Sequence, residues 1–205
     1  MLEFKNVEIA EGYNPLSFVV MPGEVLAVID SENDGKCPLV DVALGRRPAT
    51  KGYVTIEGEL VTVGSAPYFR KNIGYVPNDV DFPLHKVGDL VSAMIEISAS
   101  RGKECTKAMV NSEMAILGLN ETMLEHDVKT MDKVELRMAL VAVCAAMGGR
   151  LLVVDNPVDG VDERFSKVLA IMAQKGWAVV VTERGDYLEC DKKVVLNKEG
   201  EHKDD

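Results

Sequence analysis

Short apolar runs rich in valine and isoleucine recur along the chain, and their spacing distinguishes two kinds of strand. The early runs LEFKNVEI, LSFVV and YVTIEG alternate more between apolar and polar positions and are joined by turn residues, which favours an antiparallel sheet. LLVVD and WAVVVT are almost continuously apolar, as expected of parallel strands covered by helices on both faces. EVLAVI, IGYV and KKVVLN add further strands. The pattern therefore predicts an α/β protein with both kinds of sheet.

Between about residues 87 and 148 the pattern becomes helical. One helix is predicted from a single apolar stripe at helical spacing, formed by Val87, Leu90, Val91, Met94 and Ile95. A second is predicted in DKVELRMALVAVCAAMGG, which stops at Gly148-Gly149. Asp132 and Glu135 open this helix in the spacing of a capping box. Its expected apolar face consists of Val134, Met138, Val141 and Ala145.

The composition excludes several classes of function. The chain has 205 residues, of which 47% are apolar and 27% charged, and its net charge is −10. Nucleic-acid binding is not expected, because phosphate contacts need clustered lysine and arginine. Neither a membrane-spanning run nor a secretory leader is recognisable. The four cysteines and three histidines are scattered, so we expect no metal site and predict a cytoplasmic protein with reduced thiols.

The segment IDSENDGKCPLVDVALG comes directly after a predicted strand and has the outline of a phosphate-binding loop. The pattern G-x-x-x-x-G-K-[ST] requires glycine at its first and sixth positions, then lysine, then a serine or threonine with a hydroxyl group. Gly35 and Lys36 match it, whereas Asp30 replaces the first glycine and Cys37 the hydroxyl residue. Glu32 and Asp34 add two carboxylates to the loop. The segment alone is weak evidence for nucleotide binding.

Over nearly its whole length the chain resembles the nucleotide-binding subunit of ATP-binding cassette (ABC) transporters. PGEVLAVIDSENDGKCPLVDVALG resembles the Walker A region, KGYVTIEGE the hairpin after it, and FRKNIGYVPNDVDFP the approach to the Q-loop. LLVVDNPVDGVDE resembles Walker B and the D-loop, and VVVTERGDYLECDKKVVLNKEG the switch-histidine strand with the strand after it. The resemblance implies a P-loop NTPase-like parallel-sheet core with a small antiparallel β subdomain and a helical insertion.

The resemblance also places functional positions, and most of their residues have changed. Asn78 occupies the Q-loop position, Asn156 that of the catalytic glutamate and Glu183 that of the switch histidine. The nucleotide-binding positions are Ser31, Asn33, Asp34, Gly35, Lys36, Cys37 and Asp155, and the signature-equivalent positions are Thr130, Met131, Asp132, Lys133 and Val134. Because the base, metal hydroxyl, signature loop and switch residue have changed together, we expect no hydrolysis by the chain alone.

Nucleotide binding is a separate question. The acids of the 30–34 loop would lie beside a polyanionic ligand, so we expect Asp34 to cap the next helix where phosphate would sit. Asp132 is expected to cap the signature helix in the same way. Lys36 either contacts nucleotide or forms an ion pair with Asp155 or a loop acid, and the sequence leaves both open. ATP and Mg²⁺ are the implied ligands if the site functions.

In the family, the helical subdomain and the Q-loop contact a membrane-spanning subunit. We therefore predict a partner-binding surface at Asn78, Phe82, Pro83 and Leu84, although the last three side chains could instead pack inward. A second ABC-type subunit, as homo- or heterodimer, is the other implied partner. The expected location is cytoplasmic and peripheral on the inner face of the membrane.

The predicted organisation is one domain over residues 1–205. Residues 1–78 carry the antiparallel strands and the P-loop part of the core, 79–131 the helical subdomain, 132–198 the remaining α/β core, and 199–205 a frayed tail. The predicted function is an ABC-type ATP-binding subunit without catalysis, a structural or regulatory partner of a membrane transporter. A divergent but working ATP-hydrolysing subunit is one alternative, and a soluble scaffold on this fold is another.

Overall fold

Two sheets form the framework of the protein. The computed structural model describes residues 1–31, 37–79, 83–100, 102–155 and 162–198. The first sheet is antiparallel, with the order β2-β1-β4-β5. Its strands are β1 (Leu2–Glu8), β2 (Leu16–Val20), β4 (Lys51–Ile56) and β5 (Glu59–Leu60). The hairpin expected from KGYVTIEGE is confirmed as β4 and β5.

The antiparallel sheet contains an irregularity that explains one glycine. The pairing of β1 shifts register on both sides between Phe4 and Glu8, and Asn6 has a φ of 48°. Gly52 on β4 faces this point, and a Cβ added there would lie 2.1 Å from the carbonyl oxygen of Asn6. Only glycine allows the two backbones to approach this closely.

The second sheet is parallel, with the order β6-β7-β8-β3-β9. Both strands that the sequence marks as continuously apolar are buried along their whole length, which confirms that prediction. The strands are β3 (Val25–Ile29), β6 (Ile73–Val76), β7 (Leu151–Val154), β8 (Ala178–Glu183) and β9 (Lys192–Val195).

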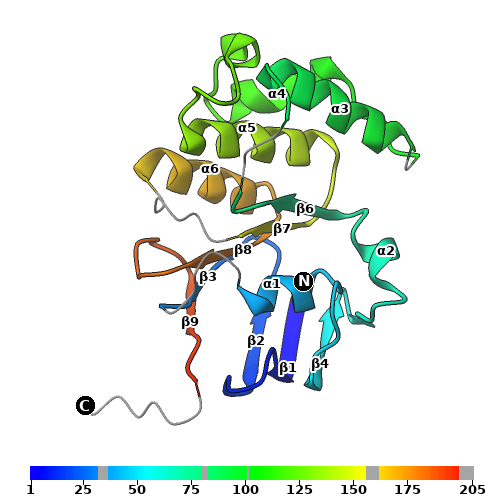
Figure 1. Cartoon of the computed structure of the whole chain (residues 1–205), viewed down its shortest axis with the longest axis vertical. Helices are drawn as coiled ribbons and strands as arrows, with labels where there is room; N and C mark the ends of the chain where they lie inside the picture. Colours follow the sequence, from blue (N-terminus) through cyan, green and yellow to red (C-terminus); the bar gives the residue numbers. More distant parts are fainter. Residues whose placement is uncertain (32–36, 80–82, 101, 156–161, 199–205) are drawn as a thin grey trace.

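Helices and the antiparallel sheet cover opposite faces of the parallel sheet (Figure 1). Helices α3 to α6 pack on one face, and α1 with the antiparallel sheet lies on the other, so the buried side chains form two hydrophobic clusters. The helices are α1 (Pro38–Ala43), α2 (Ala66–Phe69), α3 (Val87–Ser100), α4 (Lys107–Ile116), the 3₁₀ helix η1 (Glu121–Glu125), α5 (Lys133–Ala146) and α6 (Glu163–Gln174). None of these described helices is long and apolar enough to cross a bilayer.

Helix α5 differs from its prediction in two respects. It is buried on nearly all sides rather than along one stripe, because it lies between β6, α4 and α6. Gly74 permits this approach, since a Cβ there would lie 2.9 Å from the Cβ of Cys144. Asp132 caps the helix as expected, whereas the carboxylate of Glu135 accepts a hydrogen bond from Arg164 Nη1 at 3.3 Å. In a capping box the side chain of Glu135 would accept a hydrogen bond from the backbone amide of Asp132. Here it forms an ion pair with Arg164 of α6 instead.

The fold class predicted from the sequence is confirmed. The boundaries at residues 78, 131 and 198 stay predictions. The predicted tail, 199–205, lies outside the described residues.

Candidate functional site

Three acidic residues lie at the carboxyl ends of neighbouring parallel strands. Asp30 comes directly after β3, Asp155 directly after β7, and Glu183 is the last residue of β8. The carboxyl ends of parallel strands lie at one edge, where ligands bind in open α/β sheets. The register pairs Ile29 with Glu183, and the amide of Asp30 donates to the backbone oxygen of Glu183 at 2.8 Å. We call Asp30, Asp155 and Glu183 the strand-end acids.

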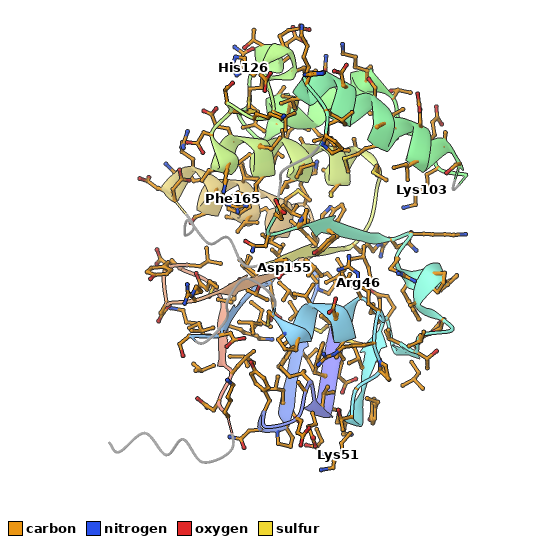
Figure 2. All side chains as sticks on the ribbon, viewed as in Figure 1. Arg46, Lys51, Lys103, His126, Asp155 and Phe165 are labelled. Carbon is orange, nitrogen blue, oxygen red and sulfur yellow. The ribbon has the colours of Figure 1, made fainter. Side chains whose placement is uncertain are left out.

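Asp155 is held by two neighbouring strands. Tyr75 Oη on β6 donates to Asp155 Oδ2 at 3.1 Å, and Thr182 Oγ1 donates to Asp155 Oδ1 at 3.5 Å. Burial raises the pKa of Asp155, and the hydrogen bond from Tyr75 opposes this rise. The guanidinium of Arg46 lies 4.5 Å from the centre of the Tyr75 ring, on the side of α1 (Figure 2). Tyr75 therefore contacts both a half-buried carboxylate and an exposed cation.

Glu183 is completely enclosed. Its side chain has no exposed area, and its Oε1 accepts a long hydrogen bond of 3.4 Å from the amide of Leu188. No described residue provides a hydrogen bond to its Oε2. Burial raises the pKa of Glu183, while the amides of Leu188 and Tyr187 counteract it. Enclosure thus works against the charged form of this carboxyl group.

Cys37 lies at the start of α1 and is equally buried, at 3% exposure. Burial, with a smaller contribution from Asp30 and Asp155, raises the pKa of its thiol to about 12. The group is therefore a neutral thiol at physiological pH. Mg²⁺ prefers oxygen ligands, and no described group of acidic, histidine or cysteine side chains is arranged to hold a metal. The described donors at this position do not fit Mg²⁺.

Several predicted site residues lie outside the described residues. Three of them have a predicted role: Asp34 as a helix cap, Lys36 as a contact for nucleotide or an acid, and Asn156 at the catalytic position. The others are Asn33, Gly35 and Phe82. Ser31 is described and exposed. The predictions on the phosphate loop itself stay predictions.

The signature-equivalent residues surround the start of α5. Asp132 Oδ1 accepts a hydrogen bond from the amide of Val134 at 2.7 Å, so the expected cap is confirmed. Arg164 of α6 also approaches Asp132 Oδ2, at 3.4 Å. Met131 and Val134 are buried, whereas Thr130 and Lys133 are exposed. A carboxylate therefore satisfies this helix start from within the chain, where an external anion would otherwise bind.

The predicted partner segment begins at Asn78, just beyond the end of β6. The backbone oxygen of Asn78 accepts a hydrogen bond from Arg137 Nη2 at 3.1 Å. Pro83 is exposed, while Leu84 is half-buried against the core of the helical region. The inward packing considered for Leu84 is therefore observed at this residue, and the partner-binding role of the segment stays a prediction.

Sequence reasoning missed three residues that organise this region. Arg137 is 1% exposed within the central helix, Tyr75 contacts Asp155, and Arg46 stacks on Tyr75. A single arginine inside the apolar pattern of α5 is a signal for Arg137. Nothing in the local pattern of β6 shows that Tyr75 reaches a residue 80 positions later in the chain.

Comparisons with known proteins agree with this architecture. Residues 13–159 match the family model described as ABC transporter. A putative ribose/galactose/methyl galactoside import ATP-binding protein of Pseudomonas syringae is 22% identical, over 98% of this chain and 41% of its own length. A putative ABC transporter ATP-binding protein of Pyrococcus furiosus is 28% identical, over 88% of this chain and 69% of its own. The chain thus spans about two fifths of the first relative.

Solved structures support the fold. The cbiO1 protein of Clostridium perfringens, described as part of the ABC transporter complex cbiONQ, superimposes with a TM-score of 0.75 at 18% identity. The superposition covers 97% of this chain and 85% of that protein. The family match extends over more than half of the sequence. The chain therefore belongs to the ABC transporter family.

Proposed function

We propose that this protein is an ABC-type subunit that does not hydrolyse ATP and acts as a structural or regulatory partner of a membrane transporter. The observation that carries the proposal is the state of Glu183. A residue that accepts or relays a proton must reach the reacting group. The side chain of Glu183 has no exposed area, so its carboxyl group cannot reach a ligand in the role of the switch histidine.

The surroundings of Asp155 support the same conclusion. Both of its carboxylate oxygens accept hydrogen bonds from the protein, and the neighbouring thiol of Cys37 is neutral. In the family, Mg²⁺ and ATP are bound at the corresponding positions. To bind Mg²⁺ here, Asp155 would have to give up hydrogen bonds within the protein. The thiol of Cys37 would be a poor ligand for this cation, which prefers oxygen. Asn156, at the position of the general base, has no proton-accepting carboxylate.

The implied setting is the inner face of a membrane. A membrane-spanning subunit would be contacted through the segment from Asn78 to Leu90, and a second ABC-type subunit, identical or different, would supply the catalytic activity. A soluble scaffold on the same fold would lack the first of these contacts. Co-purification with a membrane subunit encoded beside this chain would separate these two functions.

A turnover assay with Mg²⁺ and ATP tests the proposal. We expect the purified chain to release phosphate no faster than the buffer background. Lys36→Ala and the exposed control Lys129→Ala should then behave alike. A measurable turnover that Lys36→Ala abolishes and Lys129→Ala preserves would establish the alternative, a divergent working ATPase.

A further inference from the structure

A pocket of about 310 Å³ lies at the opposite edge of the parallel sheet from the strand-end acids. Its lining includes Ile73 and Leu151, the first residues of β6 and β7, whereas Asp155 comes after the last residue of β7. Further lining residues come from α2 and from the β4–β5 hairpin of the antiparallel sheet. Because both sheets contribute to it, we call it the intersheet pocket. The residues on which its chemistry depends are Glu57, Glu59, Tyr68, Phe69, Asn72 and Arg150.

The buried part of the intersheet pocket is apolar. Ile56, Phe69 and Leu151 line it and are almost completely enclosed. Tyr68 lines it too, and its side chain is 61% exposed. The rings of Tyr68 and Phe69 meet edge to face, with 5.3 Å between their centres. Apolar and aromatic walls with a few polar groups are typical of small-molecule sites, so the pocket suits a ligand with an apolar body.

Two opposite charges line the same pocket without pairing with each other. Glu59 of β5 and Arg150, just before β7, are both exposed, and no described residue forms an ion pair or hydrogen bond with either side chain. Glu57 differs, because its carboxylate accepts a hydrogen bond from the amino group of Met1. The pocket therefore presents one available carboxylate and one available guanidinium beside an apolar surface.

We infer that the intersheet pocket binds a small zwitterion with an apolar or aromatic body, of the size of an amino acid or a dipeptide. The ammonium group of this ligand lies against Glu59, and its carboxylate lies against Arg150, whose guanidinium can donate two parallel hydrogen bonds. Its apolar body covers the ring of Tyr68. The inference goes beyond the proposed function and does not depend on it, because the pocket and the nucleotide positions are at opposite edges of the sheet.

Ligands with a single kind of charge match the intersheet pocket less well. A nucleotide or another phosphate compound would bring its negative charge beside Glu57 and Glu59. A simple amine would leave Arg150 without a counter-charge and place a second cation beside it. The volume is also at the lower limit of small-molecule sites, which favours a compact ligand.

The test measures the binding of four compounds to the full chain by isothermal titration calorimetry. L-phenylalanine and the dipeptide glycyl-phenylalanine are zwitterions that differ in the separation of their charges. Phenethylamine lacks the carboxylate, and phenylpropionate lacks the ammonium group. We expect at least one zwitterion to bind, and both singly charged compounds to bind about fivefold more weakly, because each loses one exposed charge pair.

Two variants identify the partner of each charge. Glu59→Gln should weaken the binding of the zwitterion and of phenethylamine, and should spare phenylpropionate. Arg150→Gln should weaken the zwitterion and phenylpropionate, and should spare phenethylamine. The matched controls are Glu96→Gln and Arg184→Gln, which make the same changes at exposed residues outside the pocket lining and should leave every affinity unchanged. Thermal unfolding verifies that all four variants fold.

Three results would overturn the inference. They are no binding of either zwitterion at millimolar concentrations, equal affinity for zwitterions and singly charged compounds, and equal effects of the pocket variants and their controls. If phenethylamine binds as tightly as the zwitterions and only Glu59→Gln weakens it, the pocket is a site for amines instead. The turnover assay is independent of these results, because detectable ATP hydrolysis would contradict the proposed function and leave the ligand of the intersheet pocket unaffected.

Discussion

Tyr75 belongs to two regions of the molecule, because it contacts Asp155 of the strand-end acids and also lines a pocket with the cationic residues Arg46, Arg70 and Lys71. Its hydroxyl donates to the carboxylate of Asp155, and its ring lies under the guanidinium of Arg46. In the first region Asp30 and Glu183 are buried, and the half-buried Asp155 accepts hydrogen bonds from Tyr75 and Thr182. In the second region Arg70 and Lys71 extend into solvent and are accessible to a partner.

The difference indicates which property of the fold has been kept. Burial raises the pKa of both Glu183 and Asp155, so it works against their charged forms at the edge of the sheet where a ligand would bind. Arg70 and Lys71, by contrast, are exposed beside their pocket. This contrast supports the proposal that the protein serves as a partner rather than as a hydrolase.

The largest effect is expected from Arg137, which holds the backbone of Asn78 just after β6. Arg137→Ala removes a buried side chain and its hydrogen bond to the backbone of Asn78. We expect the free energy of unfolding to fall by about 3 kcal/mol, as for other buried charged groups that lose a partner. Urea denaturation measures this, with the exposed Arg184→Ala as control. Equal stability of the two variants would show that the Asn78 segment needs no such anchor.

A smaller and pH-dependent effect is expected from Glu183. Its pKa is raised in the folded state, so folding takes up protons between the ordinary and the raised value, and stability falls as pH rises through this interval. Glutamine cannot ionise, so Glu183→Gln should not lose stability in this pH interval. At neutral pH its free energy of unfolding should exceed that of the parent chain by on the order of 1 kcal/mol. Denaturation at a series of pH values from about 5 to about 8 measures the difference.

In the control variant the dependence of stability on pH is expected to have the opposite sign. Glu163 is exposed, and its hydrogen bond to Lys167 lowers its pKa, so Glu163→Gln removes a small stabilisation that is present above the ordinary value and lost in acid. If Glu183→Gln and the parent chain show the same pH dependence, the carboxyl group of Glu183 is not held in its protonated form.

The smallest effect is expected from the link between the two regions. Tyr75→Phe keeps the ring under Arg46 and removes the hydrogen bond to Asp155. The expected loss of stability is about 1 kcal/mol, the usual net contribution of one hydrogen bond. The pKa of Asp155 should rise further, because Tyr75 opposes the effect of burial. Tyr53→Phe, at an exposed ring, serves as control, and an equal response of both variants would argue against the link.

Much of the fold could be predicted because local patterns report burial directly. The continuous apolar runs of β7 and β8, the alternating strands and the stripe from Val87 to Ile95 all correspond to observed elements. The cap by Asp132 was also predictable, since it depends only on a carboxylate two positions before an amide. The burial of α5 was incompletely predicted, because contacts on its other sides come from β6, α4 and α6, which are distant in sequence.

The sequence by itself determined the family, the order of the strands along the chain and the residue types at the positions of the nucleotide site. Only the tertiary structure decided that Glu183 is enclosed, that Tyr75 contacts both Asp155 and Arg46, and that three cations surround one pocket. The reason is physical. A hydrophobic pattern arises from local geometry, whereas the ionisation and accessibility of a side chain depend on neighbours that the folded chain brings from other strands and helices.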